Sequence, residues 1–252
     1  MPDIYLPTGD QGQVDQMMLD ALKAAGIDVS QPLPVDVRLG FPLLPAARGA
    51  AADLLRAGYP SVRIETKAPP GLEDDPFASI PTTVATVQLV ATPDSLRWLR
   101  DGLSPFAAAR GGSMTGTVVA PVLGEPKPPP WEADPSGDST ADQADQDILD
   151  TVFAWDLDKN AAMTFTAGLG FESEQAARET AAVLINAGYQ EVHLAQAPLG
   201  WVAEAAVSMT PKLKAIRSLR INLTTFAQSR GGIWLGFRIV APPPRIMDDR
   251  VL

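Results

Sequence analysis

The chain has 252 residues, 30 of them acidic and 20 basic, which gives a formal net charge of −10 at pH 7. It has no cysteine and one histidine, His193, which excludes disulfides, thiolate nucleophiles and zinc sites built from Cys or His clusters. Because no apolar run is long enough to span a bilayer and the N-terminus does not read as a signal peptide, we expect a cytoplasmic protein with no membrane partner. The acidic balance argues against direct binding of nucleic acid.

The N-terminal region predicts a helix followed by a strand. Val14, Met17, Met18 and Leu22 form an apolar stripe at helical spacing, and Gly26 ends it. Apolar and polar residues then alternate as in a half-buried strand over residues 35–41.

The rest of the first half predicts two more helices and three more strands. Glycines end both helices, and Pro93 suits the first turn of the second one. In chain order we expect a helix at 45–57, strands at 61–66 and 82–92, a helix from Pro93 to Arg110, and a strand ending at Pro121.

Residues 122–140 read as an acidic, Pro-rich linker. Residues 122–150 carry eight acidic side chains and one basic one, so most of the excess charge lies there. The segment suits either a solvated spacer or an acidic lure for a basic partner. Its candidate contact residues are Trp131, Glu132, Asp134 and Asp138.

The two halves on either side of this linker are copies of one another. Several segments recur 130 residues apart and later ones about 120 apart, which predicts an internal duplication. The matching pairs include DQMMLD at 15–20 with DQDILD at 145–150, RAGYPSVRI at 56–64 with NAGYQEVHL at 186–194, and FAAARGG at 106–112 with FAQSRGG at 226–232.

In each copy the element order β-α-β-β-α-β predicts a ferredoxin-like sandwich with an extra N-terminal helix. The predicted fold class is therefore α+β, with domains at 1–121 and 141–252. The alternation places small and mixed side chains, without stacking aromatics, on the open sheet face, which disfavours RNA binding. It suits contact between sheet faces, either of the two copies or of two chains. We expect the copies to pair as an internal pseudo-dimer, in a chain that is monomeric overall.

No pattern of residues in the sequence is specific enough to predict a catalytic or cofactor site. His193 lies in a short strand and is expected on the surface, and adjacent loop carboxylates such as Asp248 and Asp249 suit a solvated charge run. The RGG segments lead from a helix into a strand, the reverse of a phosphate-binding loop. We predict no catalytic residue, no metal and no cofactor.

The other candidate site is formed by four arginines, two on the predicted helix that begins at Pro93 and two on its counterpart in the second copy. Arg97 and Arg100 recur as Arg217 and Arg220, and each pair shares one side of its helix. They suit either a rim whose aliphatic stems cover the core, or a docking face for an acidic protein segment, this chain's own linker included.

The residues resemble the RraB family, regulators that inhibit ribonuclease E, here as a tandem duplication. The resemblance begins at Asp15 and rests on helix stops and strand ends in both copies. The matching positions are Gly26, Asp28, Ser30, Pro32, Phe41, Pro42, Gly58, Gly111, Gly112 and Gly116, and in the second copy Asp156, Phe171, Gly188, Gly231, Gly232 and Gly236. It implies a ferredoxin-like fold and a non-enzymatic regulator.

We therefore expect a protein that acts by docking on another protein, and the resemblance implies an RNA-degrading enzyme as that partner. An acidic linker would suit a basic partner segment because it imitates a polyanion. Two alternatives remain: an immunity-type or scaffold protein that neutralises another enzyme, and an enzyme with a cleft between the two copies.

Overall fold

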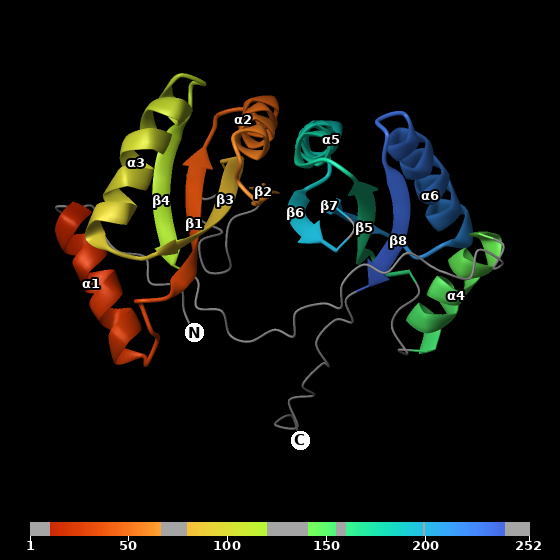
Figure 1. Cartoon of the computed structure of the whole chain (residues 1–252), viewed down its shortest axis with the longest axis horizontal. Coiled ribbons are helices and arrows are strands. Elements are labelled where there is room, and N and C mark those ends of the chain that lie inside the picture. The colour runs from red at the N-terminus through yellow and green to blue at the C-terminus, as the bar shows by residue number, and fades with distance from the viewer. Residues whose placement is uncertain (1–10, 67–79, 120–140, 155–159, 199, 240–252) are drawn as a thin grey trace.

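A computed structural model describes residues 11–66, 80–119, 141–154, 160–198 and 200–239. In this part of the chain the protein is α+β, with six helices and one eight-stranded antiparallel sheet of order β4-β1-β3-β2-β6-β7-β5-β8 (Figure 1). The predicted linker, with Trp131, Glu132, Asp134 and Asp138, lies outside the described residues. No described helix is long and apolar enough to cross a membrane.

The two halves repeat the same element order. The first half contains α1 (Gln11–Ala24), β1 (Pro32–Gly40), α2 (Leu44–Arg56), β2 (Ser61–Glu65), β3 (Thr82–Val90), α3 (Pro93–Ala108) and β4 (Ser113–Val119). The second contains α4 (Ala141–Ala154), β5 (Met163–Phe171), α5 (Glu174–Ala187), β6 (Glu191–Ala197), β7 (Gly200–Met209), α6 (Leu213–Gln228) and β8 (Ile233–Ile239).

The predicted elements are all present, with small differences at their ends. Thr92 caps α3 through a capping box with Ser95, and Pro93 occupies the first turn as expected. Its counterpart Pro211 does not, because α6 begins two residues later. Lys212 occupies the N-cap position of α6 and makes no side-chain capping hydrogen bond. In α1 the predicted stripe is wrong at Met17, which is 60% exposed.

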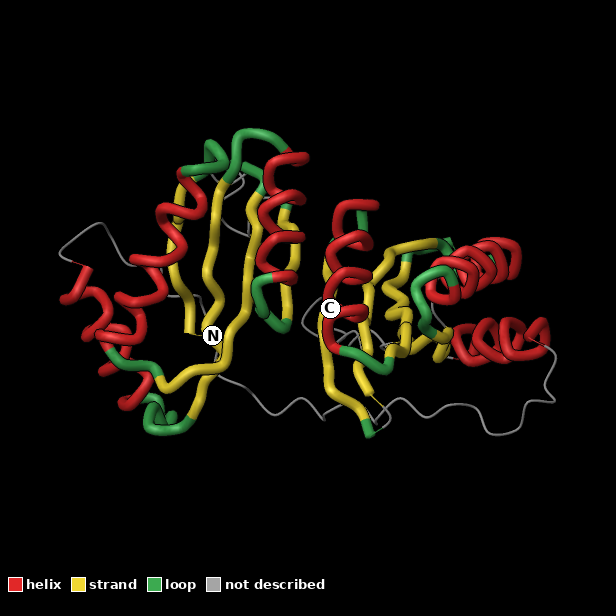
Figure 2. Tube along the Cα trace, turned by 45° about the horizontal axis from the view of Figure 1, so that its top comes forward, coloured by secondary structure: helices red, strands yellow, loops and turns green. Residues whose placement is uncertain are grey.

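The halves join edge to edge through β2 and β6, with Val62 directly opposite Val192. Figure 2 shows the two central helices, α2 and α5, side by side above this junction. Arg178 of α5 donates a hydrogen bond from Nη1 to the Leu55 carbonyl of α2 at 3.1 Å. The expected contact between sheet faces is therefore wrong: backbone pairing of two edge strands joins the copies.

One face of this long sheet forms the core. A single register row crosses all eight strands, and its central members Val37, Ala85, Val62, Val192 and Ala205 are buried in one cluster with residues of the helices. Helices cover this face in both halves, and the next row of side chains points to the opposite, open face. The open face is thus continuous across the junction.

The repeated Gly-Gly pairs have a steric cause. Gly111 and Gly231 adopt φ values of 72° and 70°, the left-handed region that ends a helix. The second glycine has no space for a side chain, since a Cβ on Gly112 would lie 2.4 Å from Cδ1 of Phe41. In the other copy a Cβ on Gly232 would lie 2.3 Å from Cε1 of Phe171.

This packing predicts opposite effects for two Gly→Ala changes, one inside α3 and one in the turn that follows it. Gly112→Ala should lower the free energy of unfolding by about 2 kcal/mol, because the buried Phe41 ring and the backbone must shift. Gly102→Ala should raise it by about 1 kcal/mol, because Gly102 lies inside α3 with nothing within 4 Å of its Cβ position. Urea unfolding of both variants checks this, and a neutral Gly112→Ala would contradict the packing argument.

Candidate functional site

Two of the four predicted docking arginines are engaged inside the molecule. Arg100 of α3 donates hydrogen bonds from Nη1 and Nη2 to the two carboxylate oxygens of Asp15 on α1, at 2.7 and 2.5 Å. Asp15 is only 2% exposed. This bidentate pair fixes α1 against α3.

The same pair recurs in the second half. Nε of Arg220 on α6 donates to both carboxylate oxygens of Asp145 on α4 at 3.0 Å, and Asp145 is fully buried. The guanidinium groups of Arg100 and Arg220 therefore hold the first helix of each half in place, as structural ion pairs. The signal was present in the sequence: both partners recur, Asp15 as Asp145 and Arg100 as Arg220.

The other predicted site residues do not form a cluster with Arg100 and Arg220. Arg97 is exposed and pairs with Asp94 one turn earlier on α3, at 3.1 Å. Arg217 is half-buried on α6. The linker residues lie outside the described ranges, so the structure does not bring them to the arginines.

The open face of the sheet carries a network of ion pairs. The alternation of residues along the strands did not predict these contacts. Arg63 on β2 donates to the carboxylates of Asp36 at 2.6 Å and Glu65 at 3.0 Å, and Arg38 also binds Glu65. Thr86 on β3 donates to the second oxygen of Asp36 at 2.6 Å. Burial alone would lower the pKa of Arg63, but the bond to Asp36 and the charges of Asp36 and Glu65 raise it above its ordinary value.

In the second half the open face holds a different set of charges. Arg238 on β8 donates from Nη1 to Oε1 of Glu204 on β7 at 2.9 Å, and both side chains are largely buried. Glu204 lies directly opposite His193 on β6, and His193 lies opposite Ser61 across the junction.

The row Ser61–His193–Glu204 has the residue types of a nucleophile, a base and an orienting acid. The contacts of such a relay are absent among these described residues, since no hydrogen bond joins His193 to Ser61 or Glu204, and Glu204 binds Arg238. Nor do the described residues bring together three or more His, Asp or Glu side chains that could hold a metal ion. The surface position expected for His193 agrees with the structure, since its side chain is half-buried on the open face.

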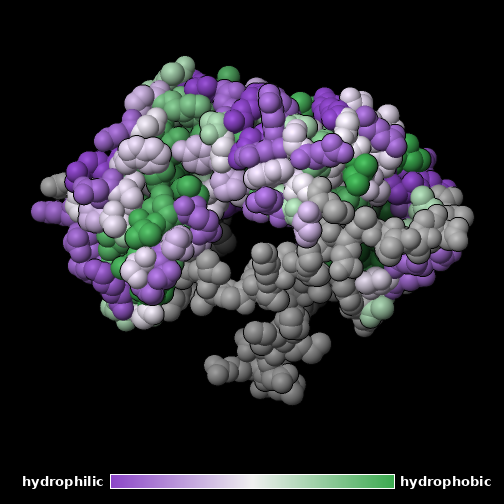
Figure 3. Space-filling view, in the orientation of Figure 1, coloured by the Kyte–Doolittle hydropathy of each residue, from purple (hydrophilic) through white to green (hydrophobic). Residues whose placement is uncertain are grey.

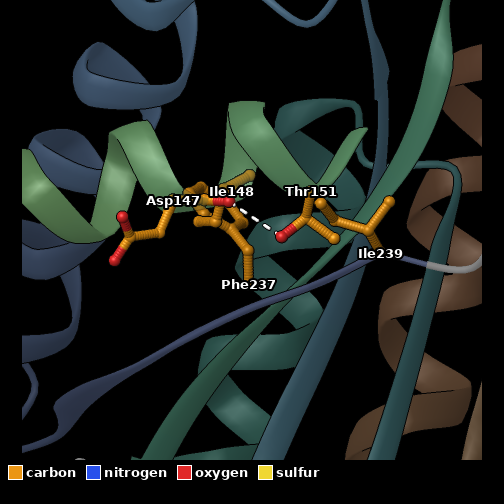
Figure 4. Close-up of a pocket in the computed structure, with 5 residues that line it drawn as sticks. All are labelled: Asp147, Ile148, Thr151, Phe237 and Ile239. Carbon is orange, nitrogen blue, oxygen red and sulfur yellow. Dashed lines mark hydrogen bonds between the residues drawn. The ribbon is translucent and has the colours of Figure 1, made fainter. Parts of the chain in front are cut away.

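A cavity of about 270 Å³ opens between α4 and β8. Figure 4 shows Ile148 and Phe237 close together, with Thr151 and Ile239 beside them, while the Asp147 carboxylate points away. The hydroxyl of Thr151 donates to the Asp147 carbonyl at 2.8 Å, so it is satisfied within the helix. The cavity is therefore apolar at its base and polar only at its rim.

A second cavity of about 250 Å³ lies at the end of α5, beside Gly188, Tyr189 and Ser208. Burial raises the pKa of the Tyr189 phenol, which keeps it neutral. Over the helices the surface has another character: Figure 3 shows hydrophilic side chains gathered above α2 and α5, where Arg56 and Glu179 pair at 3.1 Å.

Comparison with known proteins gives no relative from which residue roles could be transferred. No protein-family model matches the chain, and no curated protein matches it. The candidate contact surface is therefore defined by geometry alone: the open face, with its ion pairs Arg63–Asp36, Arg38–Glu65 and Arg238–Glu204.

The buried pair of the first half predicts a large and specific loss of stability. Asp15→Asn should lower the free energy of unfolding by about 3 kcal/mol, because it leaves the guanidinium of Arg100 uncompensated in a largely buried position. Asp20→Asn, on an exposed turn of the same helix, should change it by less than about 0.5 kcal/mol.

Chemical denaturation measures the free energy of unfolding of Asp15→Asn and Asp20→Asn. Hydrogen exchange of the α1 amides reports how firmly α1 is attached to α3. If Asp15→Asn were as stable as Asp20→Asn, the pair would not hold the helix. Replacing both Asp15 and Arg100 by leucine should recover most of the loss, since an apolar pair of similar volume removes the unpaired charge.

Proposed function

We propose that the chain is a non-enzymatic, protein-binding regulator that resembles the RraB-type inhibitors of ribonuclease E. In this proposal residues 1–121 and 141–252 are two ferredoxin-like sandwiches with an extra N-terminal helix each, joined by residues 122–140. The strand order β4-β1-β3-β2 and the helices between the strands support that assignment.

The observation that carries the proposal is the continuous open face of the eight-stranded sheet. Its arginines and carboxylates are held in place by hydrogen bonds between neighbouring strands, as in the set Asp36, Arg63 and Glu65. Side chains fixed in this way lose little conformational freedom when a partner docks, and they impose a defined charge pattern on it.

A comparison of the two copies supports a contact role for this face. Their cores keep the same kinds of residue at matching positions, as at Phe41 and Phe171 or Val62 and Val192. The open faces differ, since His193 stands at the position of Arg63. The two copies therefore share a core but present different side chains on the two halves of the open face. Such a surface suits a partner whose own contact surface is not symmetric.

The direct test is binding of a purified ribonuclease E-type regulatory region, followed by calorimetry and by inhibition of RNA cleavage. The proposal predicts a complex at about 10 μM, a concentration that detects weak association. Glu191→Arg, at an exposed position in the middle of the open face, should weaken binding by about tenfold or more.

The matched control is Lys214→Glu, an exposed charge reversal on helix α6, which should leave affinity within about twofold. Absence of any complex at that concentration would show that this target is wrong. Equal loss in both variants would show that a general charge effect, and not the open face, governs binding.

A further inference from the structure

The outer edge of the sheet at β8 is open to strand addition. β8 is the last strand in the sheet and pairs only with β5 among the described strands. An edge strand has a row of backbone N–H and C=O groups without a sheet partner, and proteins usually protect such an edge with lysine or proline. The sequence of β8, IWLGFRI, contains neither, and Ile233 is 57% exposed. Its one charged residue, Arg238, is bound to Glu204, and the register shift in its pairing with β5 has a counterpart at the other edge, between β1 and β4.

The opposite edge differs. The sequence of β4 is SMTGTVV, with a serine and two threonines in place of the large apolar residues of β8. Apolar side chains on an edge strand give an added strand more to pack against. The two ends of the sheet are therefore not equivalent, and β8 is the better acceptor.

The cavity between α4 and β8 adds a pocket to this edge. Ile148 of α4 and Phe237 and Ile239 of β8 form its apolar wall. Its volume of about 270 Å³ lies just below the usual range for small-molecule sites and leaves room for an aliphatic side chain of a neighbouring segment. A strand paired with β8 would direct every second side chain toward α4 and this pocket.

The negative charge of α4 favours a basic partner segment. Residues 141–154 contain four aspartates and no basic residue. Asp145 is neutralised by Arg220, whereas Asp147, at the rim of the cavity, and Asp150 are exposed. An added segment with positive side chains on either side of its apolar residue would complement this helix.

We propose that the β8–α4 groove, formed by the edge of β8 and by Asp147, Ile148 and Thr151 of α4, binds an extended basic segment of another protein. The segment pairs with β8 as a further antiparallel or parallel strand. It places one aliphatic side chain in the cavity and lysines or arginines beside Asp147. This is recognition by β-augmentation, in which the main chain supplies affinity and the pocket supplies specificity.

The inference rests on the proposed function only in that the occupant is again a protein, because the groove lies at the sheet edge and not on the open face. The two can fail separately. Glu191→Arg should weaken the complex of the open face and leave binding in the groove unchanged.

The test uses the full chain and a synthetic seven-residue peptide, Thr-Lys-Thr-Ile-Thr-Lys-Thr with blocked ends, whose isoleucine and lysines face one side of a strand. We expect a Kd on the order of 100 μM by calorimetry. We also expect slower hydrogen exchange of the β8 amides in the complex, with no change in β4. A peptide with glutamates in place of the lysines should bind at least about tenfold more weakly.

Two variants test the groove itself. Thr151→Arg, at the exposed rim, should weaken peptide binding by about tenfold or more, because it fills the cavity and adds a positive charge. Asp147→Lys with Asp150→Lys should weaken it similarly. The matched control is Met17→Lys with Asp20→Lys, at the corresponding exposed positions of α1, which should leave the Kd within about twofold.

Three results would overturn the proposal. The first is no binding up to about 1 mM. The second is binding that is indifferent to the α4 variants or leaves β8 exchange unchanged. The third is a peptide-free chain that sediments as a dimer and becomes monomeric with Thr151→Arg, which would assign the groove to a second copy of this chain. If the peptide fails to bind while Glu191→Arg still weakens binding of the ribonuclease E-type region, the groove proposal alone is rejected.

Discussion

The pairing of β2 with β6 determines the rest of the architecture. Val62 and Val192 are equivalent residues of the two copies and lie opposite each other, so the junction has a local two-fold relation. This short ladder therefore pairs one edge strand of each half with the other and joins the two four-stranded halves into one eight-stranded sheet. It also brings α2 and α5 together, and it leaves β4 and β8 as the two outer edges, one of which has the apolar character of an acceptor strand.

The contact surfaces follow from this arrangement and from the ion pairs that support it. Because the sheet is continuous, the charged sets around Arg63 and around Glu204 belong to one face. The buried pairs Asp15–Arg100 and Asp145–Arg220 fix α1 and α4 at the ends of the molecule. The position of α4 in turn creates the cavity beside β8, so a structural ion pair and a candidate binding groove depend on the same helix.

Much of the fold could be predicted from the sequence because local signals and the repeat agree. Helix-ending glycines, Pro93 in the first turn of α3 and the alternation in β1 located the elements to within a few residues, and the repeat supplied each of them twice. The junction could not be predicted, because edge pairing is made by backbone groups that every sequence has. The expected contact through sheet faces was wrong for that reason. The ion pair between Arg100 and Asp15 was not predicted, because amphipathic spacing shows which side of a helix a residue occupies and not which carboxylate lies opposite. Met17 was misplaced because Asp15 and Leu19 take the buried positions of α1.

The central claim is that the two copies share one sheet, and hydrogen exchange at the junction tests it most directly. The amides of Ile64 and Leu194 donate across it to the carbonyls of Gln190 and Pro60, at 2.7 and 2.6 Å. If the two copies share one sheet, both amides should exchange as slowly as those of β1 and β5, which have a neighbouring strand on each side, because all of these amides open only when the sheet opens. Exchange of Ile64 and Leu194 at the rate of an unstructured chain, with β1 and β5 still protected, would show that the copies are separate and would contradict the account.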